Sequence, residues 1–335
     1  MTTKQLQDKL IETSPQSFSS TITKGIDFAK ECHKDQYRLS GEPFVNHALR
    51  TAITLAEMGM ETNTILGGLL HNTISHCEGN SEEIKEEMID TFGDDVLNLV
   101  NLCNGINKAT ASTQTDYEII IKFILNNAED LRPVLIKLAD TLDNVRTIEY
   151  MPSERIGSKI QKVLHIYAPL AEYLNLDRIK KELEERAFEI YKPQEYEMIK
   201  EKMFLSNITQ SKKQAYLEYI KQLLSDVSPK PTIHSRVKGI YSTYNKLHKQ
   251  LKEGGNVDIS RIKDLLAFRI ITNTPDNCFN ILERMMDKGD IITEEFDDYI
   301  THPKPNGYKA LQGPLLLPEV SDTIIEVQIV TEDMH

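Results

Sequence analysis

The pattern of this 335-residue chain changes once, near the proline-rich segment 227–231. Before it, apolar residues recur with the spacing of amphipathic helices, as in the segment 65–70. After it, short β-rich runs alternate with helical stretches, which is typical of an α+β sheet domain. The length suits about two domains. We therefore predict an all-α domain over residues 1–200, a helical linker over 201–230 and a sheet domain over 231–335.

Within the sheet domain, the sequence predicts the limits of each helix and strand. We expect helices at 238–252 and 276–287, and strands at 266–272, 298–301, 311–317 and 323–331. In the helical part, we expect Pro193 to begin a helix rather than interrupt one. Backbone N–H groups in the first turn of a helix have no acceptor within the helix, so a proline there costs no hydrogen bond.

The amino-acid composition of the chain argues against several classes of protein. The net charge of −12 argues against broad electrostatic adhesion to nucleic acid, so an anionic substrate would need a local basic pocket or a metal. No apolar run approaches the roughly 18 residues that cross a bilayer, and the first residues lack an apolar signal core. We expect a cytoplasmic protein with no membrane partner. The four cysteines form no Cys-x-x-Cys pair and are predicted to be free, mostly buried thiols.

Three residues of the helical part suggest a metal site. His47, His71 and Asp140 each lie in a helix-like segment. Histidines and a carboxylate from separate helices can hold a divalent metal, which lowers the pKa of a bound water for attack on a phosphate ester. On spacing alone, ordinary core or surface positions remain the alternative for each residue.

A second group of residues lies in the sheet part. The segment 298–308 holds a strand carboxylate, Lys304 and an aromatic residue, Tyr308, next to Gly307, and a further carboxylate follows at Glu326. These residue types can bind a nucleotide and its metal. The alternatives are a turn cap, a solvent-facing strand position and a packing aromatic.

Both groups resemble a known family. The segments 235–242 and 264–269, with those around Tyr308 and Glu326, resemble the synthetase domain of the RelA/SpoT alarmone enzymes. Gly41-Glu42-Pro43 before His47, then His71, the segment 138–147 and the segment 166–171 are similar to the HD hydrolase domain of its long members. The resemblance covers most of residues 25–335. It implies an all-α HD-type hydrolase domain followed by an α+β nucleotidyltransferase-like synthetase domain with a mixed sheet, which would continue beyond residue 335.

The synthetase resemblance implies transfer of pyrophosphate from ATP to the 3′-hydroxyl of GDP or GTP with Mg²⁺. It makes Asp264 and Glu326 catalytic residues and magnesium ligands, with Glu326 as general base. The residues that it implies for nucleotide binding are Arg236 and Lys238 on the ATP phosphates, Tyr308 on guanine, and Arg269, Lys304 and Asn306. The acidic segment 294–298 resembles synthetase-specialised members. The chain departs from the family at Gly239, Gln312 and Val330, where cationic or hydrogen-bonding groups are expected.

The hydrolase resemblance implies removal of the 3′-pyrophosphate from (p)ppGpp with Mn²⁺. Its metal positions are His47, His71, Asn72 and Asp140, and its nucleotide pocket is Arg38, Ser40, Asn144, Arg146 and Thr147. However, Asn72, Ser75 and His76 stand where three carboxylates are expected. We therefore predict weak metal binding and a degenerate hydrolase domain with a regulatory role. The alternatives are a Mn²⁺-dependent hydrolase in which His76 replaces a ligand, and a catalytically silent guanine-nucleotide sensor. No direct nucleic-acid binding is expected.

Overall fold

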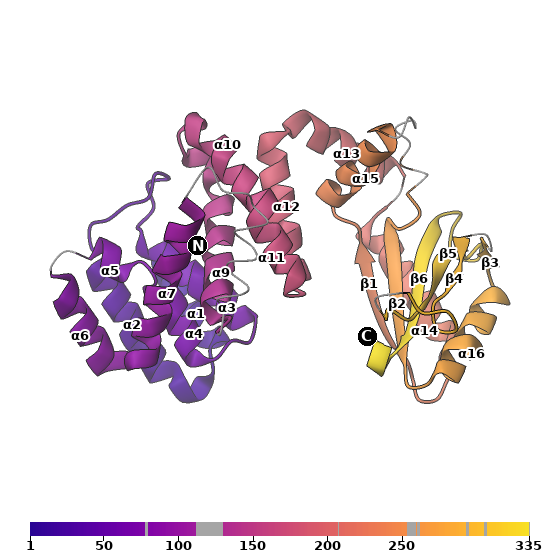
Figure 1. Cartoon of the computed structure of the whole chain (residues 1–335), viewed down its shortest axis with the longest axis horizontal. Coiled ribbons are helices and arrows are strands. Elements are labelled where there is room, and N and C mark those ends of the chain that lie inside the picture. The colour runs from indigo at the N-terminus through magenta and orange to yellow at the C-terminus, as the bar shows by residue number, and fades with distance from the viewer. Residues whose placement is uncertain are drawn as a thin grey trace. The chain divides into compact units, whose positions relative to one another are not determined.

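The computed structural model of this chain describes residues 1–77, 80–111, 130–206, 208–252, 259, 262–292, 295–304 and 307–334. Glu294 and Asn306, for which the sequence made predictions, lie outside these residues. The chain forms two compact units, Met1–Tyr191 and Lys192–His335 (Figure 1). No helix in the described part of the chain is both long and apolar enough to cross a membrane.

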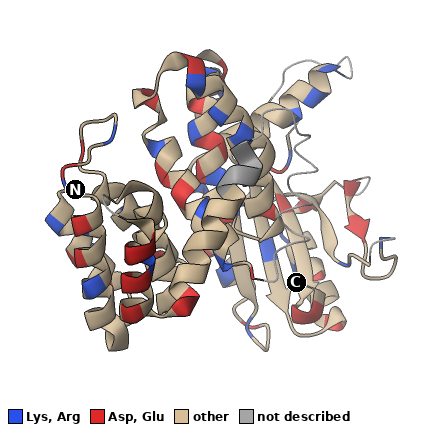
Figure 2. Ribbon diagram, turned by 60° about the vertical axis from the view of Figure 1, so that its left-hand side comes forward, with Lys and Arg blue, Asp and Glu red and all other residues tan. Residues whose placement is uncertain are grey.

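The described part of the first unit is helical, as predicted. Its helices are α1 (Thr3–Thr13), α2 (Ser19–Cys32), α3 (Val45–Glu57), α4 (Thr62–Leu70), α5 (Thr73–His76), α6 (Ser81–Phe92), α7 (Asp94–Ala111), α9 (Arg132–Arg146), α10 (Ser153–Lys162), α11 (Ala168–Tyr173) and α12 (Asp177–Tyr191), with short 3-10 turns at Gln16–Phe18 and Ile148–Tyr150. Basic and acidic residues are interspersed along the ribbon of these helices (Figure 2).

Close packing of α4 against α3 and α9 is central to this unit. A Cβ atom added to Gly68 would lie 2.3 Å from Leu55 Cδ1 of α3, and one added to Gly67 would lie 2.8 Å from Ile136 Cδ1 of α9. Because both glycines lack a side chain, the three helices approach closely and bury their apolar faces in one core. This packing brings the C-terminal end of α4 beside α3 and α9.

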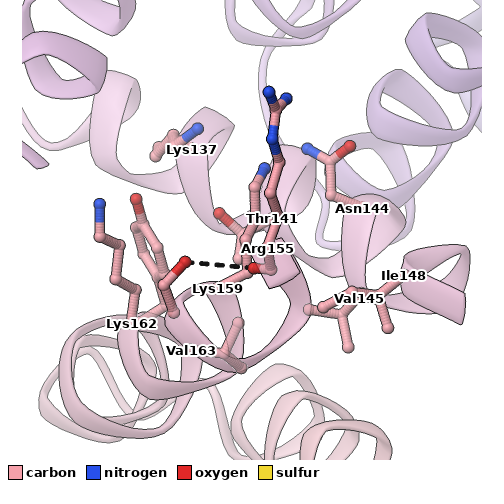
Figure 3. A pocket seen from close by; sticks show the side chains of 11 residues that line it. Lys137, Thr141, Asn144, Val145, Ile148, Arg155, Lys159, Lys162 and Val163 are labelled. Atoms are coloured by element: carbon pink, nitrogen blue, oxygen red, sulfur yellow. Dashed lines mark hydrogen bonds between the residues drawn. The ribbon is translucent and has the colours of Figure 1, made fainter. Parts of the chain in front are cut away.

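A π-helical turn, Val163–Tyr167, joins α10 to α11. Pro169 lies in the first turn of α11 and has no backbone N–H to donate to the preceding turn, which explains why the regular helical bonding is interrupted there. The turn carries Val163 and Tyr167 toward α9, where both line a pocket (Figure 3).

The second unit combines helices with a mixed sheet (Figure 1). Its elements are α13 (Pro193–Leu205), α14 (Gln210–Leu223), β1 (Thr232–Val237), α15 (Ile240–Lys252), β2 (Leu266–Thr272), α16 (Pro275–Met286), β3 (Asp290–Ile291), β4 (Asp297–Asp298), β5 (Leu311–Leu316), β6 (Ile324–Thr331) and a 3-10 turn at Glu332–Met334. The strand order is β1-β2-β6-β5-β3, with β4 also paired to β5. The β2–β6 pair is parallel and the other pairs are antiparallel.

The two faces of this sheet differ in character. Phe268 and Ile270 of β2 and Val327 of β6 are buried in the core with α14 and α16. Side chains alternate across a strand, so Arg269 and Glu326 project from the opposite face. The sheet therefore presents a polar face that α14 and α16 do not cover.

The fold class predicted from the sequence is confirmed, and several limits differ. The strand predicted at 298–301 stops at Asp298, because its Oδ1 accepts hydrogen bonds from the backbone N–H groups of Ile300 (3.0 Å) and Thr301 (2.9 Å) and turns the chain. The strand β1 was missed. The segment expected to be a linker, 201–230, contains α14, whose Tyr216 and Ile220 are buried in the core of the second unit.

Two smaller predictions concern Pro193 and the cysteines. Pro193 begins α13, as predicted. All four cysteines are free, and three of them are buried. Cys32 and Cys77 are distant in sequence but their sulfur atoms lie 2.6 Å apart. This contact was not foreseen.

Candidate functional sites

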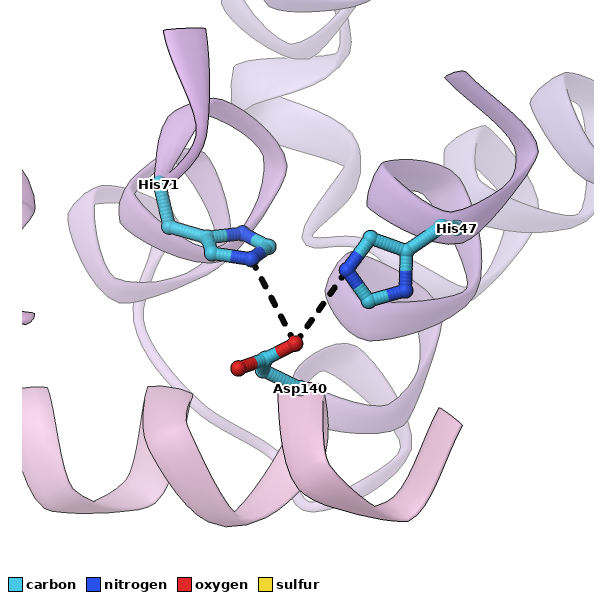
Figure 4. Close-up of side chains that lie close together, drawn as sticks. All are labelled: His47, His71 and Asp140. Carbon is cyan, nitrogen blue, oxygen red and sulfur yellow. Dashed lines mark ion pairs between the residues drawn. The ribbon is translucent and has the colours of Figure 1, made fainter. Parts of the chain in front are cut away.

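The first candidate site lies where α3, α4 and α9 meet. His47 comes from α3, His71 follows the end of α4 and Asp140 comes from α9, and all three side chains are buried. His47 Nε2 lies 3.2 Å and His71 Nε2 lies 3.6 Å from Asp140 Oδ1 (Figure 4). The candidate ligand atoms of the three residues all lie within 4.8 Å of one another. Two imidazoles and a carboxylate on separate helices suit a divalent metal.

The hydrogen bonds behind the two imidazoles orient them for this role. His71 Nδ1 donates to the carbonyl oxygen of Gly68 at 2.7 Å, and His47 Nδ1 donates to Asp143 Oδ2 at 2.7 Å. In a neutral ring, the lone pair is then on Nε2, which faces Asp140. His71 Nε2 is buried and has no hydrogen-bond partner among the described residues. A buried nitrogen acceptor left in this state fits a metal ligand.

Asp140 accepts hydrogen bonds from two other residues of α9. Asn144 Nδ2 donates to its Oδ1 and Lys137 Nζ donates to its Oδ2, each at 2.6 Å. Burial alone would raise the pKa of Asp140, but the charge of Lys137 is the largest influence that holds that pKa well below its usual value. The carboxylate is therefore ionised at neutral pH, and the Lys137 ammonium would compete with a cation for it.

A pocket of about 410 Å³ opens onto this cluster. Four residues of the predicted nucleotide pocket line it: Arg38, Ser40, Asn144 and Thr147. Arg38 Nη2 donates to Asn144 Oδ1 at 2.8 Å and to Thr147 Oγ1 at 3.2 Å. The Ser40 hydroxyl oxygen is buried without a hydrogen-bond partner among the described residues. The turn that carries Arg38 depends on Gly41, whose φ of 81° is accessible mainly to glycine.

Arg146 does not join this pocket. Its Nε and Nη2 atoms donate to the carboxylate of Glu182 on α12, at 2.6 and 2.9 Å. Arg146 is two residues beyond Asn144 on α9, and two residues rotate a side chain by more than half a turn of helix. The structure therefore places Arg146 in an ion pair with Glu182 and not among the residues that line this pocket, and its predicted role in nucleotide binding stays a prediction.

An asparagine, a serine and a histidine occupy the three positions where the family resemblance led us to expect carboxylates. Asn72 lines the pocket, and the Ser75 hydroxyl donates to the Asn72 carbonyl oxygen at 3.0 Å. The His76 ring stacks on Phe44 with a centroid separation of 4.9 Å. Burial and the nearby His71 lower the pKa of His76. In the described part of the chain, His76 is not a member of the candidate metal cluster.

The second candidate site lies beside the polar face of the sheet, in a pocket of about 580 Å³ lined by Asp264, Glu326, Lys246 and Lys263, among others. Asp264 precedes β2, and its two oxygens accept hydrogen bonds from Lys238 and Lys246, each at 2.8 Å. Burial would raise the pKa of Asp264, but the hydrogen bonds and charges of these lysines lower it. Burial and the charge of Asp264 raise the pKa of Glu326. Two carboxylates that disfavour each other's charge suit a shared divalent cation.

The register of the strands places the other predicted residues in rows across the sheet. Arg236 of β1 and Glu326 of β6 both pair with Ala267, one on each side of β2. In the next row, Arg269 donates to Gln328 Oε1 from Nε (3.1 Å) and Nη2 (2.9 Å). Residues directly opposite each other point to the same face, so Arg236 and Arg269 both lie on the face that carries Glu326.

Tyr308 lies at the end of this face. Its hydroxyl donates to Gln312 Oε1 at 2.7 Å, and the ring packs against Ile271 and Val330. Lys304 Nζ lies 5.3 Å from the centre of the Tyr308 ring and 4.3 Å from that of Tyr299. The structure thus brings Lys304 and Tyr308 together. It says nothing of Asn306, which lies outside the described residues.

Three residues with clear roles in these sites were missed from the sequence. Asp143 is fully buried and binds His47, Lys137 binds Asp140, and Lys246 binds Asp264. A signal existed for the first two: Lys137 and Asp143 lie three residues before and after Asp140, on the same face of one helix. Lys246 gave no comparable signal, because its contact depends on the position of α15 relative to β2.

Known proteins share both parts of this chain. A family described as "HD domain" matches residues 25–176, and one described as "Region found in RelA / SpoT proteins" matches residues 235–335. A GTP pyrophosphokinase of Myxococcus xanthus is 34% identical over 323 residues, which are 94% of this chain and 41% of that protein. A guanosine-3′,5′-bis(diphosphate) 3′-pyrophosphohydrolase of Aquifex aeolicus is 34% identical over 330 residues, which are 98% of this chain and 46% of that protein.

The architecture is that of an all-α HD-type domain followed by an α+β synthetase-type domain with a mixed sheet. The chain belongs to the RelA/SpoT family. It spans less than half of the length of the curated relatives described above, whose names include both a pyrophosphokinase and a pyrophosphohydrolase.

Solved structures show partial likeness. Small alarmone synthetase 1 from Bacillus subtilis matches 40% of this chain and 73% of its own, with 25% identity and a TM-score of 0.33. A metazoan orthologue of SpoT that hydrolyses ppGpp matches 52% of this chain and 96% of its own, with 21% identity and a TM-score of 0.34.

Proposed function

We propose that the second unit transfers pyrophosphate from ATP to the 3′-hydroxyl of GDP or GTP, and that the HD pocket binds a guanine nucleotide in a regulatory role. The observation that carries the first part is the placement of Asp264 and Glu326 in one pocket with Lys246. Membership of the RelA/SpoT family supports it. The cytoplasmic location expected from the sequence stays a prediction.

The chemistry follows from the charges of these side chains. Asp264 and Glu326 would hold Mg²⁺, which would neutralise charge on the transferred phosphates. Glu326, whose pKa is raised by burial and by Asp264, is suited to accept the proton of the attacking 3′-hydroxyl. Arg236, which lies on the same sheet face as Glu326, and Lys238, which donates to Asp264, would bind the phosphates of ATP. Tyr308 would stack on guanine, with Lys304 beside it.

The substitution Glu326→Gln tests the synthetase. We expect kcat to fall by about 10²–10⁴-fold, as for loss of a general base, while nucleotide affinity changes little. The assay is incubation with Mg²⁺, ATP and GDP or GTP, with products separated by chromatography. The control is Glu319→Gln, since Glu319 is exposed and pairs loosely with Lys288 at 3.7 Å.

Two results would contradict the proposal. Glu326→Gln that keeps more than about a tenth of the activity would remove Glu326 from the proton transfer. An unchanged chain that binds both nucleotides and makes no alarmone would instead support the sensor function. A longer form of the protein that is also inactive would exclude the synthetase.

For the first unit we propose little hydrolysis of (p)ppGpp. The reason is that Asn72, Ser75 and His76 supply no carboxylate to the pocket that contains His47 and Asp140. We expect slow release of pyrophosphate in the presence of Mn²⁺. Asn72→Asp should increase Mn²⁺ affinity more than turnover, because a water-activating carboxylate would still be missing. Rapid hydrolysis that His71→Ala abolishes would overturn this proposal.

One observation favours the alternative, a Mn²⁺-dependent hydrolase. His71 Nε2 is buried without a hydrogen-bond partner among the described residues, and it faces Asp140 beside His47. A cation there would satisfy it. A calorimetric titration with Mn²⁺ distinguishes the degenerate HD domain from the hydrolase. Absence of measurable binding would exclude the hydrolase. Tight binding together with rapid turnover of (p)ppGpp would establish it.

The regulatory role requires that occupancy of one unit changes affinity at the other. Such coupling exists only if a ligand binds two states of the protein with different affinities. The measurement is guanine-nucleotide affinity at the HD pocket with the synthetase pocket empty and then saturated. Equal affinities in the two conditions would remove the regulatory part of the proposal.

A further inference from the structure

Two cysteines that neither candidate site uses meet in the first unit. Cys32 is the last residue of α2, and Cys77 directly follows α5. They lie 45 positions apart in the sequence, yet their sulfur atoms are 2.6 Å apart. The sulfur atoms of a disulfide lie about 2.05 Å apart. The two side chains therefore already stand close enough for a bond to form between them.

One glutamine holds the backbone on both sides of this contact. Gln36 Nε2 donates to the carbonyl oxygen of His76 at 2.5 Å and to that of Cys32 at 3.3 Å. Its Oε1 atom lies 3.0 Å from His33 Nδ1. Because Gln36 bridges Cys32 to the residue before Cys77, the two thiols stay together through contacts that do not depend on a bond between the sulfur atoms.

The two thiols differ in access to solvent and in acidity. Cys32 is buried, whereas Cys77 is only half-buried. Burial, and then the contact with Cys77, raise the pKa of the Cys32 thiol. The thiolate is the form that reacts with an oxidant, and exposure decides which thiol meets the oxidant first. Cys77 is therefore suited to react first, and Cys32 is placed to react with the product.

The other two cysteines provide a comparison within the same chain. Cys103 and Cys278 are both buried, and Cys103 Sγ lies 3.7 Å from the carbonyl oxygen of Pro133. Burial raises the pKa of Cys103 to about 12 and that of Cys278 to about 11. In the described part of the chain, neither has a second sulfur atom in contact. Both are expected to be unreactive in the folded chain.

The cysteine pair is linked to the HD pocket through α5. Asn72 and Phe44 line that pocket, and α5 begins directly after Asn72. At the other end of α5, the His76 ring stacks on Phe44. A bond at Cys77 would therefore fix one end of a short segment whose other end carries His71 and Asn72.

We propose that Cys32 and Cys77 form a reversible disulfide in the presence of a peroxide, and that this bond fastens α5, and with it the segment that carries His71 and Asn72, to α2. The proposal does not depend on the functions proposed above for the two units. In a reducing compartment such a pair remains as thiols until an oxidant is present, and disulfides of this kind act as redox sensors.

Hydrogen peroxide supplies the oxidising equivalents for this bond. The Cys77 thiolate attacks one peroxide oxygen and the O–O bond breaks, which leaves Cys77 as a sulfenic acid. The departing hydroxide takes the proton that Cys77 gave up. The Cys32 sulfur then attacks the Cys77 sulfur, the S–O bond breaks, and hydroxide leaves with the Cys32 proton as water. In all, the two thiols lose two electrons and two protons, and the peroxide is reduced to two waters.

The test treats the full chain with hydrogen peroxide, removes the peroxide and blocks the remaining thiols with N-ethylmaleimide under denaturing conditions. Peptides produced without reduction are then analysed by mass spectrometry. We expect a pair of peptides joined through Cys32 and Cys77, which dithiothreitol separates, while Cys103 and Cys278 in the same sample carry the blocking group. If no joined pair forms, or if Cys77 instead links two copies of the chain, the proposal is overturned.

Two variants separate the roles of the two thiols. Cys32→Ser should leave Cys77 as a sulfenic acid, which dimedone traps. Cys77→Ser should leave Cys32 unlabelled by dimedone, because Cys32 is buried. The matched control is Cys103→Ser, also buried in the first unit, which should still give the joined pair. Circular dichroism checks that each variant is folded. Equal dimedone labelling of Cys32 and Cys77 in the two variants would contradict the assigned order of reaction.

Hydrogen–deuterium exchange tests the effect on α5. Exchange is compared between the peroxide-treated and the reduced chain for peptides from α2 and α5, with peptides from β1 and β2 as an internal comparison. We expect slower exchange in α5 after oxidation, reversed by dithiothreitol, and no effect of peroxide on α5 in Cys77→Ser. A disulfide that forms and leaves the exchange of α5 unchanged would refute the proposed fastening of α5 to α2.

Discussion

Replacing Asp143 by asparagine would remove a negative charge from the interior of the first unit. Asp143 is fully buried, and its carboxylate accepts hydrogen bonds from His47 Nδ1 at 2.7 Å and from Arg50 Nε at 2.5 Å. Arg38 Nη1 lies 3.5 Å from the same carboxylate. The substitution keeps the shape of the side chain and changes its charge.

The magnitude follows from these contacts. Breaking a buried ion pair by removing one partner costs about 3–5 kcal/mol. Arg50 keeps a second carboxylate, Glu42, at 2.6 and 2.8 Å, and asparagine can still accept one hydrogen bond, so we expect the lower end, about 3 kcal/mol. For a unit that ends at Tyr191, this corresponds to a fall in Tm of roughly 6–12 °C.

The same substitution should weaken metal binding. Asp143 holds His47 with Nδ1 as the donor, which directs Nε2 toward Asp140. Loss of such a supporting carboxylate lowers metal affinity by about 10–100-fold. Scanning calorimetry at pH 7 measures the first effect and titration with Mn²⁺ measures the second.

The control is Asp8→Asn, because Asp8 forms an exposed pair with Lys4 and should change stability by less than about 1 kcal/mol. An Asp143→Asn variant that melts within about 2 °C of the unchanged chain and binds Mn²⁺ equally well would refute the reasoning.

Two further predictions test packing and charge. Gly313→Ala would place Cβ 2.7 Å from the backbone of Phe296, so we expect the second unit to lose about 1–3 kcal/mol in chemical denaturation, whereas Gly157→Ala, with open space around it, should be neutral or stabilising. The hydrogen bond from Arg132 lowers the pKa of Asp95 below 3.8. A carboxyl group whose pKa is lower in the folded chain stabilises the fold at pH values above its unfolded-state pKa. This stabilisation is lost as the pH falls through the folded-state pKa. The Tm difference caused by Arg132→Gln should therefore shrink between pH 6 and about pH 3; a constant difference would contradict this.

Much of the architecture could be predicted because it depends on short-range pattern. The burial of Leu66 and Leu70 follows from their helical spacing, and β2 was predicted with its observed limits because it is a short run rich in apolar and β-branched residues. The edge strand β1 was missed because it pairs on one side only and alternates exposed with half-buried residues. The strand at Asp298 was predicted too long because a side-chain hydrogen bond ends it.

By itself, the sequence determined the order of the two domains, the helical or extended state of most segments, and the candidates His47, His71 and Asp140. Which charges meet was decided by the tertiary structure. Asp143 lies against His47, Arg146 turns away to Glu182, and the cations of α10 face α9, because the close approach of α3, α4 and α9 sets which sides of the helices are buried. Ion pairs between residues far apart in the chain leave no periodic trace, since each depends on how two separately formed helices pack.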